Sequence, residues 1–193
     1  MKAALIVFEG MTYLDFVGFY DPLTRLKSMN VMPDFEWRIL SNRPQVADDR
    51  GPGMKMIPDG VMEPLGGYDL VYVPGGMGTR PLQRDGEFVQ WLKTAAPAGL
   101  KVSVCTGALL LGAAGFLQGR RATTHPGALK DLEPYCGKVM TERIVDEGSV
   151  ITGGGVSSSI DLGLHVVQKL AGAEARSRIA AQMCYPYQWL PGQ

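Results

Sequence analysis

The hydrophobic residues of this chain fall into short continuous runs that alternate with longer segments of helical spacing. Lys2–Phe8 is a nearly continuous apolar run, which is typical of a strand covered on both faces. Short β-branched runs predict further strands at Phe35–Leu40, Tyr68–Val73, Lys101–Val104 and Arg121–Thr124. The segments Ile144–Asp146 and Ser149–Thr152 flank a Glu147-Gly148 turn and predict a hairpin-like pair.

Segments with helical spacing separate these strands. Helices are predicted at Asp15–Ser28, Glu87–Ala96, Gly107–Leu117, Ser158–Leu170 and Ala173–Met183. Strands that alternate with helices predict one α/β domain over residues 1–193, a three-layer α/β/α sandwich with a mostly parallel central sheet. Sites in such sheets form at the carboxyl ends of strands, so the loops after Val73, Val104 and Thr152 are the places to search.

Composition narrows the class of protein. The 193 residues carry 19 Lys and Arg against 19 Asp and Glu, so the basic excess of a nucleic-acid binder is missing. Hydrophobic residues make up 46% and charged residues 20%, which indicates a globular chain. The longest uncharged stretch, Val102–Gln118, is shorter than the ~20 residues that cross a bilayer. We therefore expect a soluble protein with neither a nucleic acid nor a membrane as partner.

The cysteines Cys105, Cys136 and Cys184 are few, odd in number and free of metal-ligand spacing, and the chain has only two histidines. We expect no disulfide framework and no metal site. Sparse free thiols favour a reducing compartment, so the expected location is the cytoplasm.

The strongest local signal is Cys105, where a predicted strand runs into a cysteine and then directly into an apolar helix at Gly107. This order predicts a nucleophile elbow, a sharp turn that exposes the side chain at its tip. A helix N-terminus stabilises a thiolate, so we expect Cys105 to have the lowest pKa of the three thiols. The alternative is a small buried core residue, as most free cysteines are.

Two glycine-rich loops follow neighbouring strands. Gly75 and Gly76 come directly after Tyr68–Val73, and their backbone N–H groups are candidates for holding an anion opposite Cys105, the alternative being an ordinary turn. Gly154 lies in the loop after the last strand and is a further candidate for substrate binding. That loop, Gly153-x-Gly155-x-x-Ser158, falls short of a dinucleotide fingerprint because no β-α-β unit follows it. Ser158 and Asp161 have the spacing of a capping box for the last long helix.

The last part of the predicted site is a carboxyl group. Asp15 follows the first strand at the same edge of the sheet as Cys105 and is the candidate for proton transfer with the thiol. Thr12-x-x-Asp15 is also a capping-box pattern, and Glu9 is a second candidate acid. His125 follows another strand and is a possible supporting residue, with a structural role equally open.

Several of these segments together resemble the ThiJ/PfpI superfamily, whose members are flavodoxin-like and related to class I glutamine amidotransferase domains. The resemblance covers about Lys2 to Met183. The segments that carry it are Pro74-Gly75-Gly76, Val104-Cys105-Thr106-Gly107, Leu111–Gly119, Ala122-Thr123-Thr124-His125 and Ile151–Gly155. The Cys-Thr-Gly elbow and the segment after it are most similar to the branch that holds isocyanide hydratases and the ligand-sensing domains of some AraC-type regulators.

The resemblance implies that Cys105 is the nucleophile, that Asp15 is the active-site acid, and that the N–H groups of Gly76 and Thr106 polarise a substrate. It implies hydration of an isocyanide to an N-substituted formamide without a metal or organic cofactor, in a homodimer with the site near the interface. Val17 and Phe19 stand where the family has Thr and Pro, and Pro126 stands where isocyanide hydratases have a bulky aromatic. We expect these positions to lie near the pocket and to affect the choice of substrate.

Two other classes of function remain open. One is a glyoxalase- or deglycase-type enzyme that acts on reactive carbonyls. The other is a non-enzymatic sensor of a ligand or an oxidant. The chain ends at Gln193, soon after the predicted domain, so no DNA-binding module is expected after it.

Overall fold

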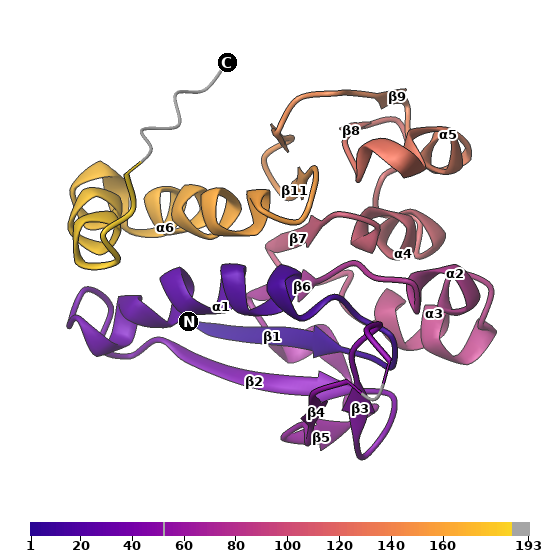
Figure 1. The fold of residues 1–193 in the computed structure, drawn as a ribbon, viewed down its shortest axis with the longest axis horizontal. Coiled ribbons are helices and arrows are strands. Elements are labelled where there is room, and N and C mark those ends of the chain that lie inside the picture. The colour runs from indigo at the N-terminus through magenta and orange to yellow at the C-terminus, as the bar shows by residue number, and fades with distance from the viewer. Residues whose placement is uncertain (52, 187–193) are drawn as a thin grey trace.

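A seven-stranded sheet forms the centre of the computed structural model, which describes residues 1–51 and 53–186 (Figure 1). Its strands lie in the order β10-β11-β7-β6-β1-β2-β5. They are β1 Lys2–Val7, β2 Glu36–Ser41, β5 Gly60–Val61, β6 Leu70–Val73, β7 Leu100–Val104, β10 Ile144–Asp146 and β11 Val150–Gly153. All neighbouring pairs are parallel except β10 with β11, which form the predicted antiparallel hairpin. The prediction of a mostly parallel sheet is confirmed.

Helices cover both faces of this sheet. Helix α1 (Tyr13–Ser28) packs against α6 (Ser158–Gln182), whereas α3 (Gly86–Lys93) and α4 (Gly107–Ala113) belong to crossovers that run in the opposite direction. Right-handed crossovers of opposite direction place their helices on opposite faces. Every residue from Ala3 to Val7 of β1 is buried, so neither face of this strand is open to water. The chain therefore forms the expected three-layer sandwich.

Smaller elements complete the fold outside the main sheet. The short strands β3 (Val46–Ala47) and β4 (Lys55–Met56) pair with each other. The remaining elements are short helices, α2 at Thr79–Leu82 and α5 at Leu129–Leu132, with 3₁₀ turns at Leu65–Gly67, Pro126–Ala128 and Glu133–Tyr135. The hydrophobic pattern did not predict β3 and β4, because two residues are too few to show an alternation.

The predicted strand Arg121–Thr124 is wrong in length and in place. Only β8, Arg121–Ala122, is extended, and it pairs with β9 (Lys138–Val139) away from the central sheet. The next two residues are buried and take other partners: the Thr123 N–H donates to Thr152 Oγ1, and the Thr124 hydroxyl donates to the Cys105 carbonyl. Because Thr123 bonds to β11 and Thr124 bonds to the elbow, neither residue continues the pairing of β8 with β9.

The two helices predicted at the C-terminal end are both present and follow each other in α6, with a kink between them. Gly172 has a φ of 87° inside α6, which is a conformation that glycine adopts without strain. The predicted break between Leu170 and Ala173 lies at this residue. Within the described ranges, no helix has both the length and the apolar character needed to cross a membrane.

Candidate active site

Cys105 forms the strand-to-helix turn that the sequence predicts. It lies between the end of β7 at Val104 and the start of α4 at Gly107, with a φ of +53°. A positive φ at a non-glycine residue is strained and is characteristic of functional sites. The Cys105 N–H lies 3.0 Å from the Gly153 carbonyl and 2.8 Å from that of Gly154. These contacts from β11, with the Thr124 hydroxyl on the Cys105 carbonyl, hold the turn in place.

Asp15 lies in the first turn of α1 with no exposed surface, and its carboxyl interacts with the Cys105 thiol. Its Oδ2 accepts a hydrogen bond of 2.9 Å from the Gly75 N–H. Its Oδ1 is buried without a hydrogen bond to any described residue. A buried carboxyl with one oxygen unused is costly unless it carries a proton or meets a ligand, so this arrangement favours a chemical role.

The capping-box interpretation of Asp15 is wrong. Thr12 is the residue at the N-cap of α1, but its side chain makes no capping bond and donates instead to Asp49 Oδ2 at 2.9 Å. The second predicted capping box fails in the same way, because Ser158 donates to the Gly155 carbonyl and Asp161 pairs with Arg143. In both cases tertiary partners replace the local capping bonds.

Gly75 is the point where the parts of the site converge. A Cβ on this residue would lie 2.6 Å from the Thr106 nitrogen, 2.7 Å from the Cys105 Cβ and 2.8 Å from Asp15 Oδ2. Only glycine allows the acid and the thiol to approach each other here. The role of Gly75 is therefore to leave room for the acid and the thiol. Its N–H donates to Asp15 rather than to a substrate, contrary to expectation.

Gly76 and Thr106 bond to each other. The Gly76 N–H donates to Thr106 Oγ1 at 3.0 Å, and the Thr106 hydroxyl donates to the Gly76 carbonyl at 3.1 Å. The Gly76 N–H was expected to polarise a substrate together with the Thr106 N–H. Because it donates to the Thr106 hydroxyl, it is not free to do so in this structure. The Thr106 N–H is directed at the Cys105 sulfur, where it can stabilise negative charge.

The electrostatics of the pair differ from the expectation for an elbow cysteine. Burial and the negative charge of Asp15 together raise the pKa of Cys105 to about 12, although the Thr106 N–H lowers it. Burial also raises the pKa of Asp15, to about 7. The prediction that Cys105 has a depressed pKa is therefore wrong, because the thiol is buried beside a carboxyl of the same charge sign.

The other candidates lie around the site rather than in it. Gly154 holds the Cys105 backbone through its carbonyl, while its own N–H donates to the Arg143 carbonyl. His125 accepts a hydrogen bond from the Gly127 N–H and caps a 3₁₀ turn. Glu9 is exposed and accepts from the Ala47 N–H, so Asp15 is the acid that the structure brings to the thiol.

A cavity of about 280 Å³ adjoins the elbow. Its walls include Thr124 and Gly154, which hold the Cys105 backbone, together with Pro126 and Arg143. Pro126 therefore lines a cavity next to residues that hold the elbow, and its effect on the choice of substrate stays a prediction. Val17 is 40% exposed on α1, whereas Phe19 is buried in the core, so Phe19 is not a pocket residue.

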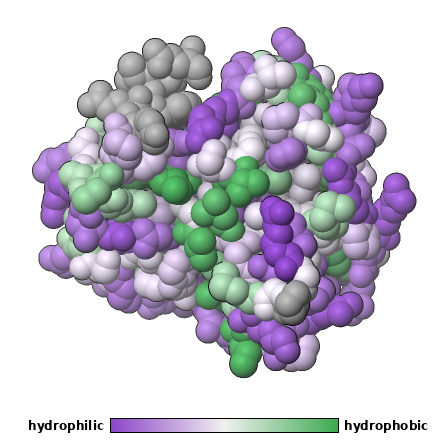
Figure 2. Space-filling model, viewed as in Figure 1, coloured by the Kyte–Doolittle hydropathy of each residue, from purple (hydrophilic) through white to green (hydrophobic). Residues whose placement is uncertain are grey.

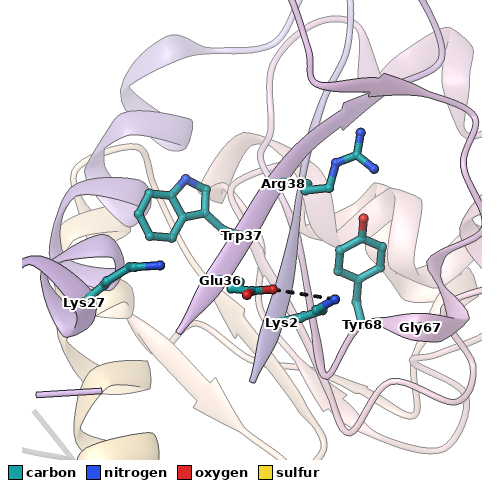
Figure 3. Close-up of a pocket in the computed structure, with 7 residues that line it drawn as sticks. All are labelled: Lys2, Lys27, Glu36, Trp37, Arg38, Gly67 and Tyr68. Atoms are coloured by element: carbon teal, nitrogen blue, oxygen red, sulfur yellow. Dashed lines mark ion pairs between the residues drawn. The ribbon is translucent and has the colours of Figure 1, made fainter. Parts of the chain in front are cut away.

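A second cavity, of about 480 Å³, lies at the amino ends of β1 and β2, the opposite end of the sheet from Cys105 (Figure 3). Its lining is basic and aromatic, with Lys2, Trp37, Arg38 and Tyr68 among the residues drawn. Two of its basic side chains have acidic partners, since Lys2 lies 3.6 Å from Glu36 and Arg38 pairs with Glu63. This cavity shows no connection to the thiol.

Three residues that contribute to the site were not predicted. Tyr72 donates to the main-chain carbonyl of Asp15, Thr124 holds the elbow, and Asp49 accepts a hydrogen bond from Thr12 at the N-cap of α1. The polar tip of Tyr72 in an otherwise apolar run before the glycine loop was a usable signal. For Asp49 the sequence offers no signal, because it lies in a loop without periodicity.

Comparisons with known proteins agree with the fold. The profile of the DJ-1/PfpI family matches residues 1–169. An isonitrile hydratase from Pseudomonas putida is 35% identical over 96% of this chain and 78% of its own length. The transcriptional regulator CdhR from Pseudomonas aeruginosa is 31% identical over 92% of this chain but only 53% of its own length, so the chain spans about half of that regulator. A solved ThiJ/PfpI family protein from Pseudomonas syringae is 26% identical, with a TM-score of 0.85 over 100% of this chain and 78% of that chain.

Proposed function

Because the chain belongs to the DJ-1/PfpI family, we propose that it is a cofactor-independent enzyme that hydrates isocyanides to N-substituted formamides, with Cys105 as nucleophile. The observation that carries this proposal is the contact of a buried, partly unsatisfied Asp15 carboxyl with the Cys105 thiol. The similarity to an isonitrile hydratase supports the choice of substrate, since isonitrile is another word for isocyanide.

The first step forms a covalent adduct. The Cys105 sulfur attacks the terminal carbon of R–N≡C, and the thiol proton passes through Asp15 to that same carbon. The product is a thioimidate, R–N=CH–S–Cys105. A pKa of about 7 suits Asp15 for accepting a proton and returning it near neutral pH. The raised pKa of Cys105 is consistent with a thiol that is deprotonated only as it attacks.

The second step releases the product. Water adds to the thioimidate carbon with Asp15 as its base, and the nitrogen receives a proton. The carbon–sulfur bond then breaks, Cys105 regains its proton, and R–NH–CHO leaves. The Thr106 N–H stabilises the sulfur when it departs with negative charge. Overall one water is consumed for each isocyanide, and no oxidant or reductant is needed.

The alternative is a ligand sensor that performs no chemistry. The similarity to a transcriptional regulator and the raised pKa of Cys105 both favour it, because a thiol protonated at rest needs assistance to react. A glyoxalase- or deglycase-type activity on reactive carbonyls would use the same thiol and acid.

One experiment separates these functions. The protein is incubated with a small alkyl isocyanide and, in parallel, with methylglyoxal, and loss of each substrate is followed together with appearance of the formamide. We expect formamide formation that is lost in Cys105→Ser and retained in Cys136→Ser, a matched change at a half-buried thiol. Consumption of methylglyoxal alone favours the carbonyl enzyme, and binding of isocyanide without turnover favours the sensor.

We further propose that the protein is a homodimer. Leu14 and Val17, on either side of Asp15 in α1, are 46% and 40% exposed, and Ile57 is 77% exposed. Figure 2 shows apolar side chains gathered in an irregular band across the middle of one face of the molecule. Large apolar side chains exposed on a helix favour burial against a partner. An interface at α1 would bring the site close to the second subunit.

A further inference from the structure

A second carboxylate is held close to the site by the loop between β3 and β4. The Asp49 side chain in this loop is only 10% exposed. Its Oδ2 accepts the 2.9 Å hydrogen bond from Thr12, and its main-chain N–H donates to the Met11 carbonyl at 3.1 Å. These contacts hold the carboxylate of Asp49 against Met11 and Thr12, the two residues just before the first turn of α1, which carries Asp15.

We propose that Asp49 is a positioning residue of the site: its negative charge, held beside the start of α1 by Thr12, adds to the effect of burial in keeping a proton on Asp15 and so shifts the pH at which the Asp15–Cys105 pair changes its protonation. Two carboxyl groups that share a poorly hydrated site cannot both ionise without cost. In agreement with this geometry, the charge of Asp49 raises the pKa of Asp15 in addition to the effect of burial.

The groups around Asp15 come from several elements. Cys105 faces it from the elbow, the Gly75 N–H donates to its carboxyl, and the buried Tyr72 hydroxyl bonds to its carbonyl. Asp49 is the carboxylate that acts on it from the loop. The Gly75 N–H and the Cys105 thiol lower the pKa of Asp15, so they act against burial and the charge of Asp49.

The groups around Asp49 are Thr12 and Arg50. The Arg50 Nε lies 3.3 Å from Asp49 Oδ1, but the Arg50 side chain is 75% exposed, so water screens its charge. The neighbouring Asp48 faces a different group: it accepts from the Arg50 N–H and raises the pKa of Tyr13. Asp48 therefore offers a control with the same charge, one residue away.

The pair should titrate as a unit, which makes the effect of Asp49 measurable. Below the first ionisation of the pair, the thiolate fraction of Cys105 rises about tenfold per pH unit. Above it, one proton is shared between carboxyl and thiol, so the thiolate fraction is independent of pH until the second ionisation. The alkylation rate of Cys105 should therefore rise and then level off, with the break near the pKa of about 7 of Asp15.

The experiment measures iodoacetamide labelling of Cys105 by peptide mass spectrometry from about pH 5 to about pH 9, a range chosen to span this break. The proteins compared are the parent, Asp49→Asn and Asp48→Asn. We expect the break to move to lower pH by about 0.5 to 1 unit in Asp49→Asn, because a like charge has been removed, and to stay in place in Asp48→Asn. Exposed Cys184 provides an internal reference for reagent quality in every sample.

Two further variants separate charge from packing. Asn and Ser at position 49 both offer an oxygen to Thr12, so Asp49→Ser replaces Asp49→Asn should the latter unfold. Asp49→Glu keeps the charge and should leave the break within about 0.2 units of the parent. An unmoved break in the uncharged variants, or an equal shift in Asp48→Asn or Asp49→Glu, overturns the inference.

The inference concerns the same pair of residues that the proposed function uses, but labelling requires no isocyanide. A protein that fails to hydrate isocyanides and still shows the shift refutes the proposed function alone. A protein that hydrates them without the shift refutes the role of Asp49 alone.

Discussion

The Tyr72 hydroxyl donates a hydrogen bond of 2.5 Å to the main-chain carbonyl of Asp15. Tyr72 is fully buried in β6 and stacks on Phe19 of α1, with ring centroids 3.8 Å apart. Strand β6 ends at the loop that carries Gly75, so the same strand positions both the helix of the acid and the N–H that the acid accepts.

Tyr72→Phe should loosen Asp15 without removing it. We expect a loss of about 1 kcal/mol in the free energy of unfolding, since one buried hydrogen bond is lost while the ring stacking is kept. Isocyanide turnover should fall by about tenfold through kcat rather than KM, because the acid moves and the pocket does not. Denaturant unfolding and steady-state kinetics check the two parts, and full activity in a normally folded variant would show that the carbonyl contact is dispensable.

Asp15→Asn should abolish proton transfer while it preserves the shape of the site. The Asn oxygen can still accept from the Gly75 N–H, but it exchanges no proton, so kcat should fall by about 10²–10⁴. Glu9→Gln is the matched control, because Glu9 is an exposed carboxylate that the structure keeps away from the thiol. Loss of activity in Glu9→Gln together with an unaffected Asp15→Asn would reverse the assignment of the acid.

The same variant should change the pH dependence of stability. Burial raises the pKa of Asp15 from 3.8 to about 7, so ionisation costs more in the folded state. The parent should therefore lose stability from this group as the pH rises from about 4 to about 7, whereas Asp15→Asn should not. Thermal unfolding should show the variant gaining on the parent over this range, and parallel melting curves at all pH values would contradict the raised pKa.

Cys105→Ser should remove activity and keep the fold. Serine fits the same turn, but its hydroxyl stays protonated and a carboxyl of pKa about 7 is too weak a base to activate it. The melting temperature should stay near that of the parent. Formamide production at a substantial fraction of the parent rate would remove the sulfur from the mechanism.

Gly75→Ala should separate the acid from the thiol. The added methyl group would lie within 2.8 Å of Cys105, Thr106 and Asp15 atoms, which real structures do not tolerate, so the loop must shift. We expect at least a hundredfold fall in kcat, because displacements of about 1 Å disrupt catalytic geometry. Gly86→Ala is the control, since a methyl group there meets no atom within 4 Å. Equal activity losses in the two variants would argue against a special role for position 75.

The dimer proposal is checked by light scattering on the purified protein, which should give about twice the chain mass of 20.9 kDa. Leu14→Lys with Val17→Lys should produce monomers, because two charges would enter the interface and remain unpaired. Met77→Lys serves as the control, since this side chain is 66% exposed and lies outside α1. A parent protein that is monomeric at all concentrations tested rejects the proposal.

Much of the fold follows from local sequence. Lys2–Val7 is long and apolar enough to be recognised as a buried strand, and Gly172 marks the break in the last helix because glycine alone adopts its φ without strain. The elbow was also predictable, because the four residues Val104–Gly107 are contiguous and a turn between a strand and a helix is a local structure. Where a polar residue had a distant partner, as at Thr123, the local pattern predicted the wrong strand.

The chemistry of the site was decided by the tertiary structure. The sequence favours Asp15 as an acid but leaves a capping box open, and the bond of Thr12 to Asp49 and the contact with Cys105 distinguish the two. The pKa of Cys105 depends on burial and on a carboxyl from another element, and these two effects outweigh the stabilisation that a helix N-terminus offers. Electrostatic interactions act through space, so distances between segments remote in the chain set the protonation of the pair, and no local pattern contains those distances.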